Sequence, residues 1–197
     1  MKGSGGRFAF CSSLAVYVYK DDGSTLECVA VAEKTITCLT WCSAAPNLFA
    51  FSALDNKIHV WDLNEGREVA VSPAFDFAPI CVAWMTDSKT DIAVVGDKGT
   101  RFMCFCFNFS CFLDLIFMWT INAMRPSPLR MSGSGNQVTL LRWRPQAPYQ
   151  LAAGRMDGHV LLWDPAGKVT ELEHDGVESP VIAAEWDPRS PDYLLTA

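Results

Sequence analysis

The spacing of the tryptophans constrains the fold of this chain more than any other feature. Trp41 is followed by a tryptophan after 20 residues and by another after 43, and Trp143 is followed by tryptophans at the same two distances. The full set is Trp41, Trp61, Trp84, Trp119, Trp143, Trp163 and Trp186. A fixed spacing of this length indicates an array of similar structural units. We therefore expect a repeat with a period of about 43 residues.

One stretch breaks this period. Trp84 and Trp119 are 35 residues apart, where the other units have 20. Removing about 15 residues restores the spacing. Residues 104–118 are unusual in composition as well, because 12 of these 15 residues are hydrophobic. The sequence therefore predicts an apolar insertion at about 104–118.

Each unit is a series of short apolar runs separated by turns. The first run ends in tryptophan, a polar turn and a second run follow, and a turn with an aspartate leads into a third run that again ends in tryptophan. The turn aspartates are Asp55, Asp97 and Asp157. Short runs rich in Val, Ile and aromatic residues, separated by Asp, Gly and Pro, are typical of strands joined by hairpins. No unit shows a sustained helical period.

This pattern resembles the WD-repeat family, in which each unit forms one four-stranded blade of a β-propeller. Trp61-Asp62 and Trp163-Asp164 carry the dipeptide that gives the family its name. The resemblance implies an all-β fold, a WD-repeat propeller in an incomplete arc of about four blades of four-stranded antiparallel sheets. We expect a single domain over 1–197, with blade remnants at 7–32, blades at 33–75, 76–131 and 132–175, and a partial blade at 176–197.

The chain departs from the family pattern in its polar residues. A typical unit of the family joins the aspartate and tryptophan to a histidine and a hydroxyl in a buried hydrogen-bond network. Here the histidine is missing from its place, and Phe51 and Ala153 occupy the expected hydroxyl positions. We expect the blades to depend on apolar packing and each aspartate to bond its own turn.

The number of units is small for a propeller. Seven blades at this period would need roughly 300 residues, and an open arc leaves strand edges and apolar faces uncovered. The sequence therefore predicts a part of a larger protein or a truncated gene product.

No catalytic constellation emerges from the sequence. The three histidines are far apart, and the two Gly-Ser-rich stretches lack the following helix start that a phosphate site needs. Cys104, Cys106 and Cys111 are the nearest approach to a zinc ligand spacing, but they lack the remainder of such a motif. We expect no catalysis, cofactor, metal or small-molecule substrate.

The other five cysteines are expected to be structural. Cys11, Cys28, Cys38, Cys42 and Cys81 each stand singly in an apolar segment, where cysteine behaves as a small buried hydrophobic residue. The residues before Cys11 form no signal peptide, which predicts a reducing, cytoplasmic location.

The resemblance implies a protein–protein interaction scaffold, since propeller loops form a rigid rim that can bind other proteins. The loops before the first strands and the aspartate turns should emerge on one face. The candidate partner-binding residues are Glu33, Lys34, Asn56, Lys57, Phe75, Asp76, Phe77 and Lys98. Phe75 and Phe77 stand beside charges, as interface anchors do; the alternative is that the two rings cover the blade edge.

An RNA-binding propeller is the alternative function. Five arginines and no acidic residue occur between Arg125 and Arg155: Arg125, Arg130, Arg142, Arg144 and Arg155. They could form a basic patch for RNA or a solvated face of the sheet, and the formal net charge of −6 disfavours general polyanion binding.

Membrane insertion is also disfavoured. Residues 102–121 reach the length of a membrane span, but Asn108 and Asp114 would be costly in a bilayer, and the repeat assigns both ends of the segment to a blade.

Overall fold

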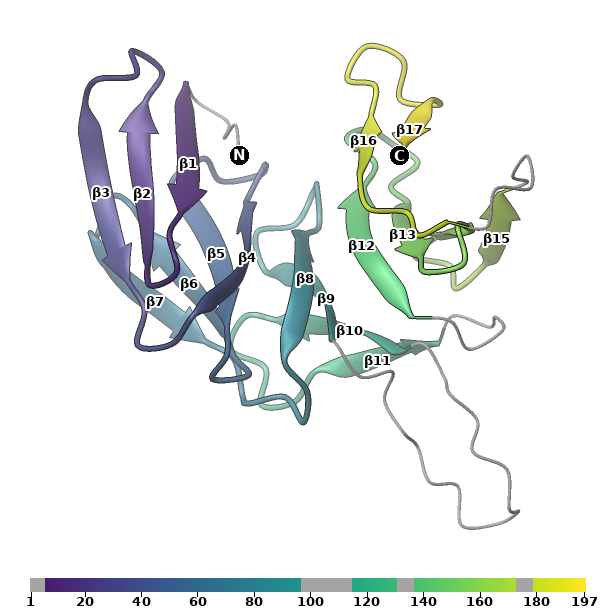
Figure 1. Ribbon diagram of the computed structural model, residues 1–197, viewed down its shortest axis with the longest axis horizontal. Coiled ribbons are helices and arrows are strands. Elements are labelled where there is room, and N and C mark those ends of the chain that lie inside the picture. Colours follow the sequence, from purple (N-terminus) through teal and green to yellow (C-terminus); the bar gives the residue numbers. More distant parts are fainter. Residues whose placement is uncertain (1–5, 97–114, 131–136, 173–178) are drawn as a thin grey trace.

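The computed structural model describes residues 6–96, 115–130, 137–172 and 179–197 (Figure 1). Within these ranges the chain forms β-strands and no helix, which confirms the predicted all-β fold. The strands form antiparallel sheets in which strands that follow one another in the sequence lie side by side.

The first two sheets come from the N-terminal part of the chain. The first has three strands, β1 (Arg7–Cys11), β2 (Ala15–Lys20) and β3 (Leu26–Val31). The second has four, β4 (Ile36–Trp41), β5 (Leu48–Ala53), β6 (Ile58–Asp62) and β7 (Arg67–Val71). β4 to β7 make a complete blade of the predicted kind.

The remaining sheets follow the same plan. The third consists of β8 (Pro79–Trp84), β9 (Asp91–Gly96), β10 (Leu115–Thr120) and β11 (Ser127–Arg130). The fourth consists of β12 (Val138–Trp143), β13 (Leu151–Arg155), β14 (Val160–Trp163) and β15 (Val169–Leu172). The last has two strands, β16 (Ala184–Trp186) and β17 (Leu194–Thr196). The described residues therefore contain three four-stranded blades between two incomplete ones.

The sheets are arranged around an open arc. In Figure 1 the sequence runs from the purple sheet of β1 to β3 around to the yellow pair β16 and β17, and the strands β4, β8, β12 and β16 border the concave side. These inner strands are neighbours in space, because β4 contacts β8, β8 contacts β12 and β12 contacts β16. The arc is incomplete, as the sequence predicted.

The apolar side chains are buried between successive sheets. Val16 and Val18 of the first sheet pack with Phe51 of the second, and Val60 of the second packs with Val82 and Trp84 of the third. A third cluster joins the third, fourth and last sheets. Because an inner sheet is covered on both faces, its strands are almost continuously apolar. Burial on both faces therefore explains the short apolar runs of the sequence.

The tryptophans at the ends of the inner strands connect neighbouring blades. Trp143 donates its indole N–H to the carbonyl of Ala83 on the preceding blade, at 3.1 Å, and Trp186 donates to the carbonyl of Arg142, at 3.3 Å. Trp41 and Trp84, at the equivalent ends of β4 and β8, are also buried. Trp143 and Trp186 therefore make the same contact, each to the blade that precedes it.

The first sheet leaves one apolar face uncovered. Phe10 is 47% exposed and Val31 is 70% exposed, and the ring of Phe10 stacks on Tyr17 with centroids 5.3 Å apart. The opposite face of this sheet packs on the second blade. An uncovered face at an end of the arc agrees with the expectation for an incomplete propeller.

The predicted insertion has a different C-terminal boundary in the structure. Residues 115–118 belong to β10, in which Phe117 pairs with Val94 and Trp119 with Ile92 of β9. The tryptophan spacing gives the length of an insertion but not its position, because a shift along the chain leaves the spacing unchanged. Residues 104–114 lie outside the described residues, as does Asp97.

Candidate partner-binding surface

Three separate segments meet at one end of the second blade. They are the loop before β4, the turn between β5 and β6, and the connection from β7 to β8. Leu54 donates its backbone N–H to the carbonyl of Thr35, at 2.9 Å, and Phe75 donates to the carbonyl of Asn56, at 2.8 Å. Backbone hydrogen bonds therefore hold the three segments together.

The same contact recurs in the fourth blade. Met156 donates its backbone N–H to the carbonyl of Gln137, at 2.9 Å, and these residues follow Leu54 and Thr35 by 102 positions each. The expectation that first-strand loops and aspartate turns emerge together agrees with both contacts. This adjacency is a property of the repeat rather than of one blade.

We use the name turn-side surface for Glu33, Lys34, Leu54, Asn56, Lys57 and Asp76. Glu33, Lys34 and Asp76 are exposed, and Asn56 and Lys57 are partly exposed. Leu54 was not among the predicted residues, but it is 53% exposed and supplies an apolar side chain among the charges. Lys98 lies outside the described residues.

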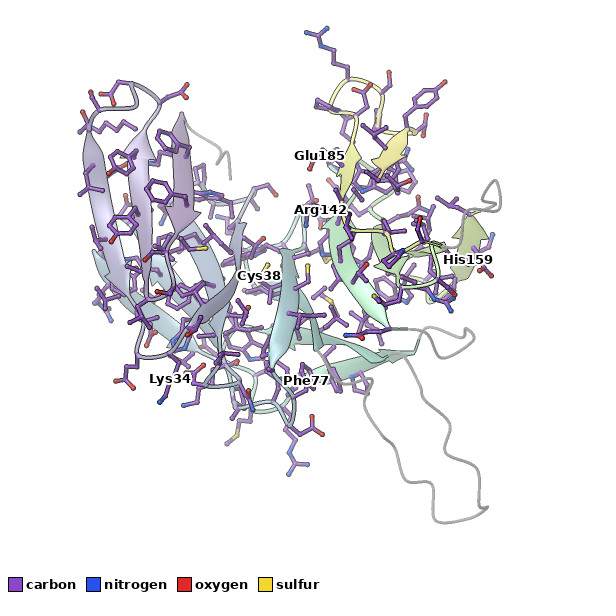
Figure 2. All side chains as sticks on the ribbon, viewed as in Figure 1. Lys34, Cys38, Phe77, Arg142, His159 and Glu185 are labelled. Carbon is purple, nitrogen blue, oxygen red and sulfur yellow. The ribbon has the colours of Figure 1, made fainter. Side chains whose placement is uncertain are left out.

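The prediction that Phe75 and Phe77 are exposed anchors needs correction. Phe75 is 6% exposed and Phe77 is 4% exposed, and their ring centroids lie 5.1 Å apart. Phe77 also packs on Phe117 of β10 at 5.4 Å and fills the space over Gly96, where an added Cβ would lie 2.0 Å from its ring. Both rings fill the boundary between the second and third blades. In Figure 2, Lys34 and Phe77 lie toward the same end of the molecule, but only Lys34 is exposed.

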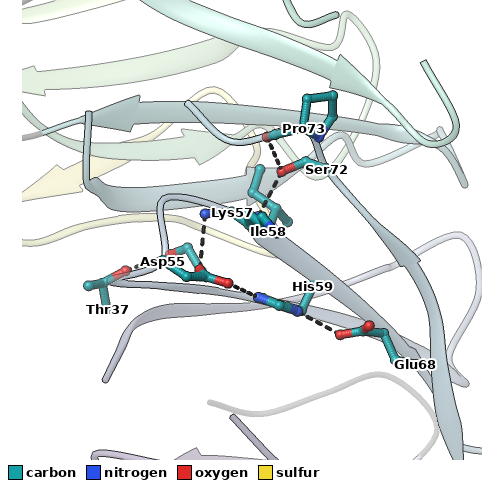
Figure 3. Close-up of polar contacts among 9 residues, drawn as sticks. Thr37, Asp55, Lys57, Ile58, His59, Glu68, Ser72 and Pro73 are labelled. Carbon is teal, nitrogen blue, oxygen red and sulfur yellow. Dashed lines mark hydrogen bonds and ion pairs between the residues drawn. The ribbon is translucent and has the colours of Figure 1, made fainter. Parts of the chain in front are cut away.

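The aspartate turn of the second blade is held by side chains as well as by its own backbone. Asp55 Oδ1 accepts a hydrogen bond from the N–H of Lys57, at 3.1 Å, as the sequence predicted. Asp55 Oδ2 lies 2.9 Å from His59 Nε2, and His59 Nδ1 lies 2.6 Å from Glu68 Oε2 (Figure 3). The ring of Phe51 stacks on His59 at 5.0 Å. This network fixes the turn that carries Asn56 and Lys57.

The sequence pattern did not predict a buried pair of hydroxyl groups between β4 and β5. Ser52 is fully buried, and its Oγ lies 2.8 Å from Thr37 Oγ1. The sequence pattern predicts the hydroxyl position one residue earlier, at Phe51, which is wrong because a shift of one residue in a strand moves a side chain to the opposite face. Ser52, directly after Phe51, is the residue in the sequence that identifies the hydroxyl position.

Arg144 and Arg155 do not belong to an exposed basic patch, which removes two of the five arginines on which the RNA-binding alternative rests. Arg155 is 1% exposed, with its Nη2 2.8 Å from Asp157 Oδ2. Arg144 is 8% exposed, lies over the Trp186 ring and pairs with Asp192. Arg144 and Arg155 therefore stabilise the fold, and the alternative prediction that they lie on a solvated face of the sheet is wrong as well.

The other arginines of this cluster differ in their surroundings. Arg142 donates from Nε to the carbonyl of Ala184, at 3.1 Å. Arg125 is exposed, and the side chain of Arg130 lies outside the described residues.

The five described cysteines differ in burial. Cys42 and Cys81 are buried as expected and Cys28 and Cys38 are partly buried, but Cys11 is exposed. Among the described residues, no group of three or more His, Cys, Asp or Glu side chains could hold a metal ion, and no helix could cross a membrane. Residues 104–111, with three cysteines, lie outside the described residues.

Comparisons with known proteins show the same fold and two segments that match one family model. Residues 26–62 and 127–164 match the family model "WD domain, G-beta repeat" (WD40). The β-propeller domain of Cps50 (Swd1) from Myceliophteria thermophila superposes with a TM-score of 0.76 at 12% identity, covering 99% of this chain and 59% of that one. A chain of the Mitotic Checkpoint Complex superposes with a TM-score of 0.73 at 16% identity, covering 96% and 53%. The fold is an incomplete β-propeller, and two segments of the chain match the WD40-repeat family model.

Two curated relatives are longer proteins. Protein transport protein SEC31 from Mycosarcoma maydis is 23% identical over 82% of this chain, and protein transport protein sec31 from Aspergillus fumigatus is 26% identical over 42%. The chain spans 12% of the first protein and 7% of the second.

Proposed function

We propose that this chain is a non-catalytic scaffold that binds other proteins through the turn-side surface. The observation that carries the proposal is the pair of backbone hydrogen bonds from Leu54 to Thr35 and from Phe75 to Asn56. They hold three loop segments in one arrangement before any partner binds. A preorganised surface loses less conformational entropy on association, which favours affinity.

The chemistry of the surface is suited to a protein partner. Leu54 supplies exposed apolar area, and the turn-side surface also carries two lysines, Lys34 and Lys57, and two acidic residues, Glu33 and Asp76. Protein interfaces combine an apolar centre with a polar rim, and charges of both signs select among partners. One similar fold belongs to a chain of a named complex, the Mitotic Checkpoint Complex, which is consistent with this use of the fold.

We also propose a finer relationship and a location. Arg7-Phe8-Ala9, Lys34-Thr35-Ile36-Thr37 and Asp192-Tyr193-Leu194-Leu195 resemble the N-terminal propeller of WD repeat-containing protein 17. The five described cysteines are free thiols, which fits a reducing, cytoplasmic compartment.

The test is an affinity purification with the full chain as bait. The double variant Lys34→Glu/Lys57→Glu reverses two charges of the turn-side surface. Lys89→Glu is the matched control, because Lys89 is exposed on the turn between β8 and β9, at the other end of the blades. We expect the double variant to lower recovery of specific partners about tenfold, a loss of about 1.4 kcal/mol, while the control retains them.

Folding is checked by the melting temperature, which should be unchanged in both variants. If every protein recovered with the parent chain is recovered equally with the folded double variant, the turn-side surface is not the binding site.

A further inference from the structure

Cys38 and Cys81 occupy equivalent positions on two neighbouring inner strands. They are 43 residues apart, which is one repeat. Each follows a register shift at the start of its strand, between Ile36 and Cys38 in β4 and between Pro79 and Cys81 in β8. A bulge of this kind re-aims the side chain next to it. The repeat therefore brings the two thiols together at the boundary of the second and third blades.

Backbone N–H groups point at both sulfur atoms. Val82 donates its N–H to Cys38 Sγ at 3.5 Å, and Leu141 donates to Cys81 Sγ at 3.3 Å. Val82 directly follows Cys81, so the Cys38 sulfur lies beside the Cys81 backbone, and the two thiols are close enough to perturb each other's ionisation. N–H donors stabilise negative charge on sulfur, so this site favours a thiolate more than an apolar core does.

The electrostatic surroundings distinguish the two sulfur atoms. The pKa of Cys38 is lowered, chiefly because the Cys81 thiol donates a hydrogen bond to it; burial opposes this effect, and the Val82 N–H and the charge of Arg142 add to it. The pKa of Cys81 is raised by the same hydrogen bond and by burial. These surroundings favour ionisation of Cys38 over ionisation of Cys81.

Arg142 is held in place on the concave side of the arc. Its Nε donates to the carbonyl of Ala184 at 3.1 Å, and its Nη1 donates to the carbonyl of Leu141 at 2.9 Å. Figure 2 shows Cys38 and Arg142 on inner strands that border the opening of the arc. A fixed positive charge beside the thiol pair stabilises a thiolate there.

Access also differs between the two thiols. Cys38 is partly exposed, whereas Cys81 is 6% exposed. Cys42 is a useful contrast, because it is fully buried and burial raises its pKa. Cys38 thus combines a lowered pKa, partial exposure and a second thiol nearby.

We propose that Cys38 and Cys81 form an oxidation site at which hydrogen peroxide produces a disulfide between the second and third blades. The Cys38 thiolate attacks one peroxide oxygen, the O–O bond breaks and hydroxide leaves, so that sulfur is oxidised to sulfenic acid and the peroxide is reduced. Cys81 then attacks the Cys38 sulfur, the S–O bond breaks, and the departing hydroxide takes the Cys81 proton to leave as water. This site is independent of the proposed partner-binding surface.

The test is a mass-spectrometric map of the oxidised full chain. The reduced protein is treated with hydrogen peroxide, blocked with iodoacetamide and digested without reduction. We expect a peptide pair joined through Cys38 and Cys81, roughly tenfold more abundant than any other cysteine pair, while Cys42 remains alkylated. This measurement needs no variant, so a folding defect cannot obscure it.

Two variants separate the steps. Cys81→Ala should stop the reaction at Cys38 sulfenic acid, which dimedone traps, and Cys38→Ala should leave Cys81 reduced. Cys42→Ala is the matched control and should form the same cross-link as the parent chain. The proposal is overturned if the folded parent chain yields no Cys38–Cys81 peptide, or if disulfides form only among other cysteines.

Discussion

The aspartate turns of the second and fourth blades have the same backbone role and different side-chain partners. In both, the aspartate Oδ1 accepts a hydrogen bond from the N–H two residues later, at 3.1 Å for Asp55 and 3.2 Å for Asp157. The other carboxylate oxygen is held by His59 in the second blade and by Arg155 in the fourth. The partner lies four residues after the aspartate in one case and two before it in the other.

The surroundings of Arg155 and His59 lead us to expect that the aspartate contact in the fourth blade stabilises the fold more than the one in the second. The side chain of Arg155 is 1% exposed, whereas that of His59 is 17% exposed and also contacts Glu68. Space is restricted beside Arg155, since a Cβ on the adjacent Gly154 would lie 2.9 Å from Val181 of the following segment. The turn thus keeps its aspartate, while the packing around each blade decides which residue holds it.

The largest effect should come from the buried partner. Arg155→Ala removes a buried cation that pairs with Asp157 and leaves unfilled space in the blade. We expect the free energy of unfolding to fall by about 3–5 kcal/mol, measured by denaturant titration. Arg67→Ala is the control, because Arg67 pairs with Glu65 at the surface and should contribute less than about 1 kcal/mol. Equal losses in the two variants would contradict the distinction between the turns.

A smaller effect should follow in the second blade. A double-mutant cycle of Asp55→Ala and His59→Ala should give a coupling energy of about 0.5–1 kcal/mol, because both side chains are partly exposed. The coupling should weaken in 1 M salt, where screening acts over about 3 Å. Strictly additive losses would show that the contact between the two side chains contributes nothing to stability.

The smallest effect concerns a turn whose aspartate is held by N–H and hydroxyl groups. Asp22, between β2 and β3, accepts hydrogen bonds from the N–H groups of Thr25 and Ser24, each at 3.0 Å, and from Thr25 Oγ1 at 2.7 Å. The N–H of Thr25, then its hydroxyl and then the N–H of Ser24 lower the pKa of Asp22 from 3.8 to about 2. Because the folded pKa is the lower one, the ionised carboxylate stabilises the turn.

This stabilisation should be complete above about pH 4 and should disappear as the pH falls toward 2. The stability difference between the parent chain and Asp22→Ala, followed by thermal melting across this range, should shrink accordingly. A difference that stays constant from pH 5 to pH 2 would mean that the Asp22 charge does not hold the turn. An NMR titration of the Asp22 carboxyl group provides a direct check.

Some features of the fold follow from local sequence patterns. Trp41, Trp84, Trp143 and Trp186 each end an inner strand, and the turn residues between the apolar runs lie where the strands reverse. A repeated pattern predicts a repeated unit because each unit meets its neighbour through the same contacts. The self-bonded aspartates were predictable for the same reason, since residues two apart in a turn are already close in space.

The sequence by itself determined the all-β repeat, its period and the adjacency of first-strand loops and aspartate turns. Only the tertiary structure decided that Phe75 and Phe77 are buried, that Arg155 and Arg144 are structural, and that two cysteines one repeat apart are in contact. The physical reason is the range of the interactions. Strand alternation and turn chemistry act over a few residues, whereas burial at a blade boundary depends on side chains such as Cys81 and Leu141, which meet across 60 positions of sequence.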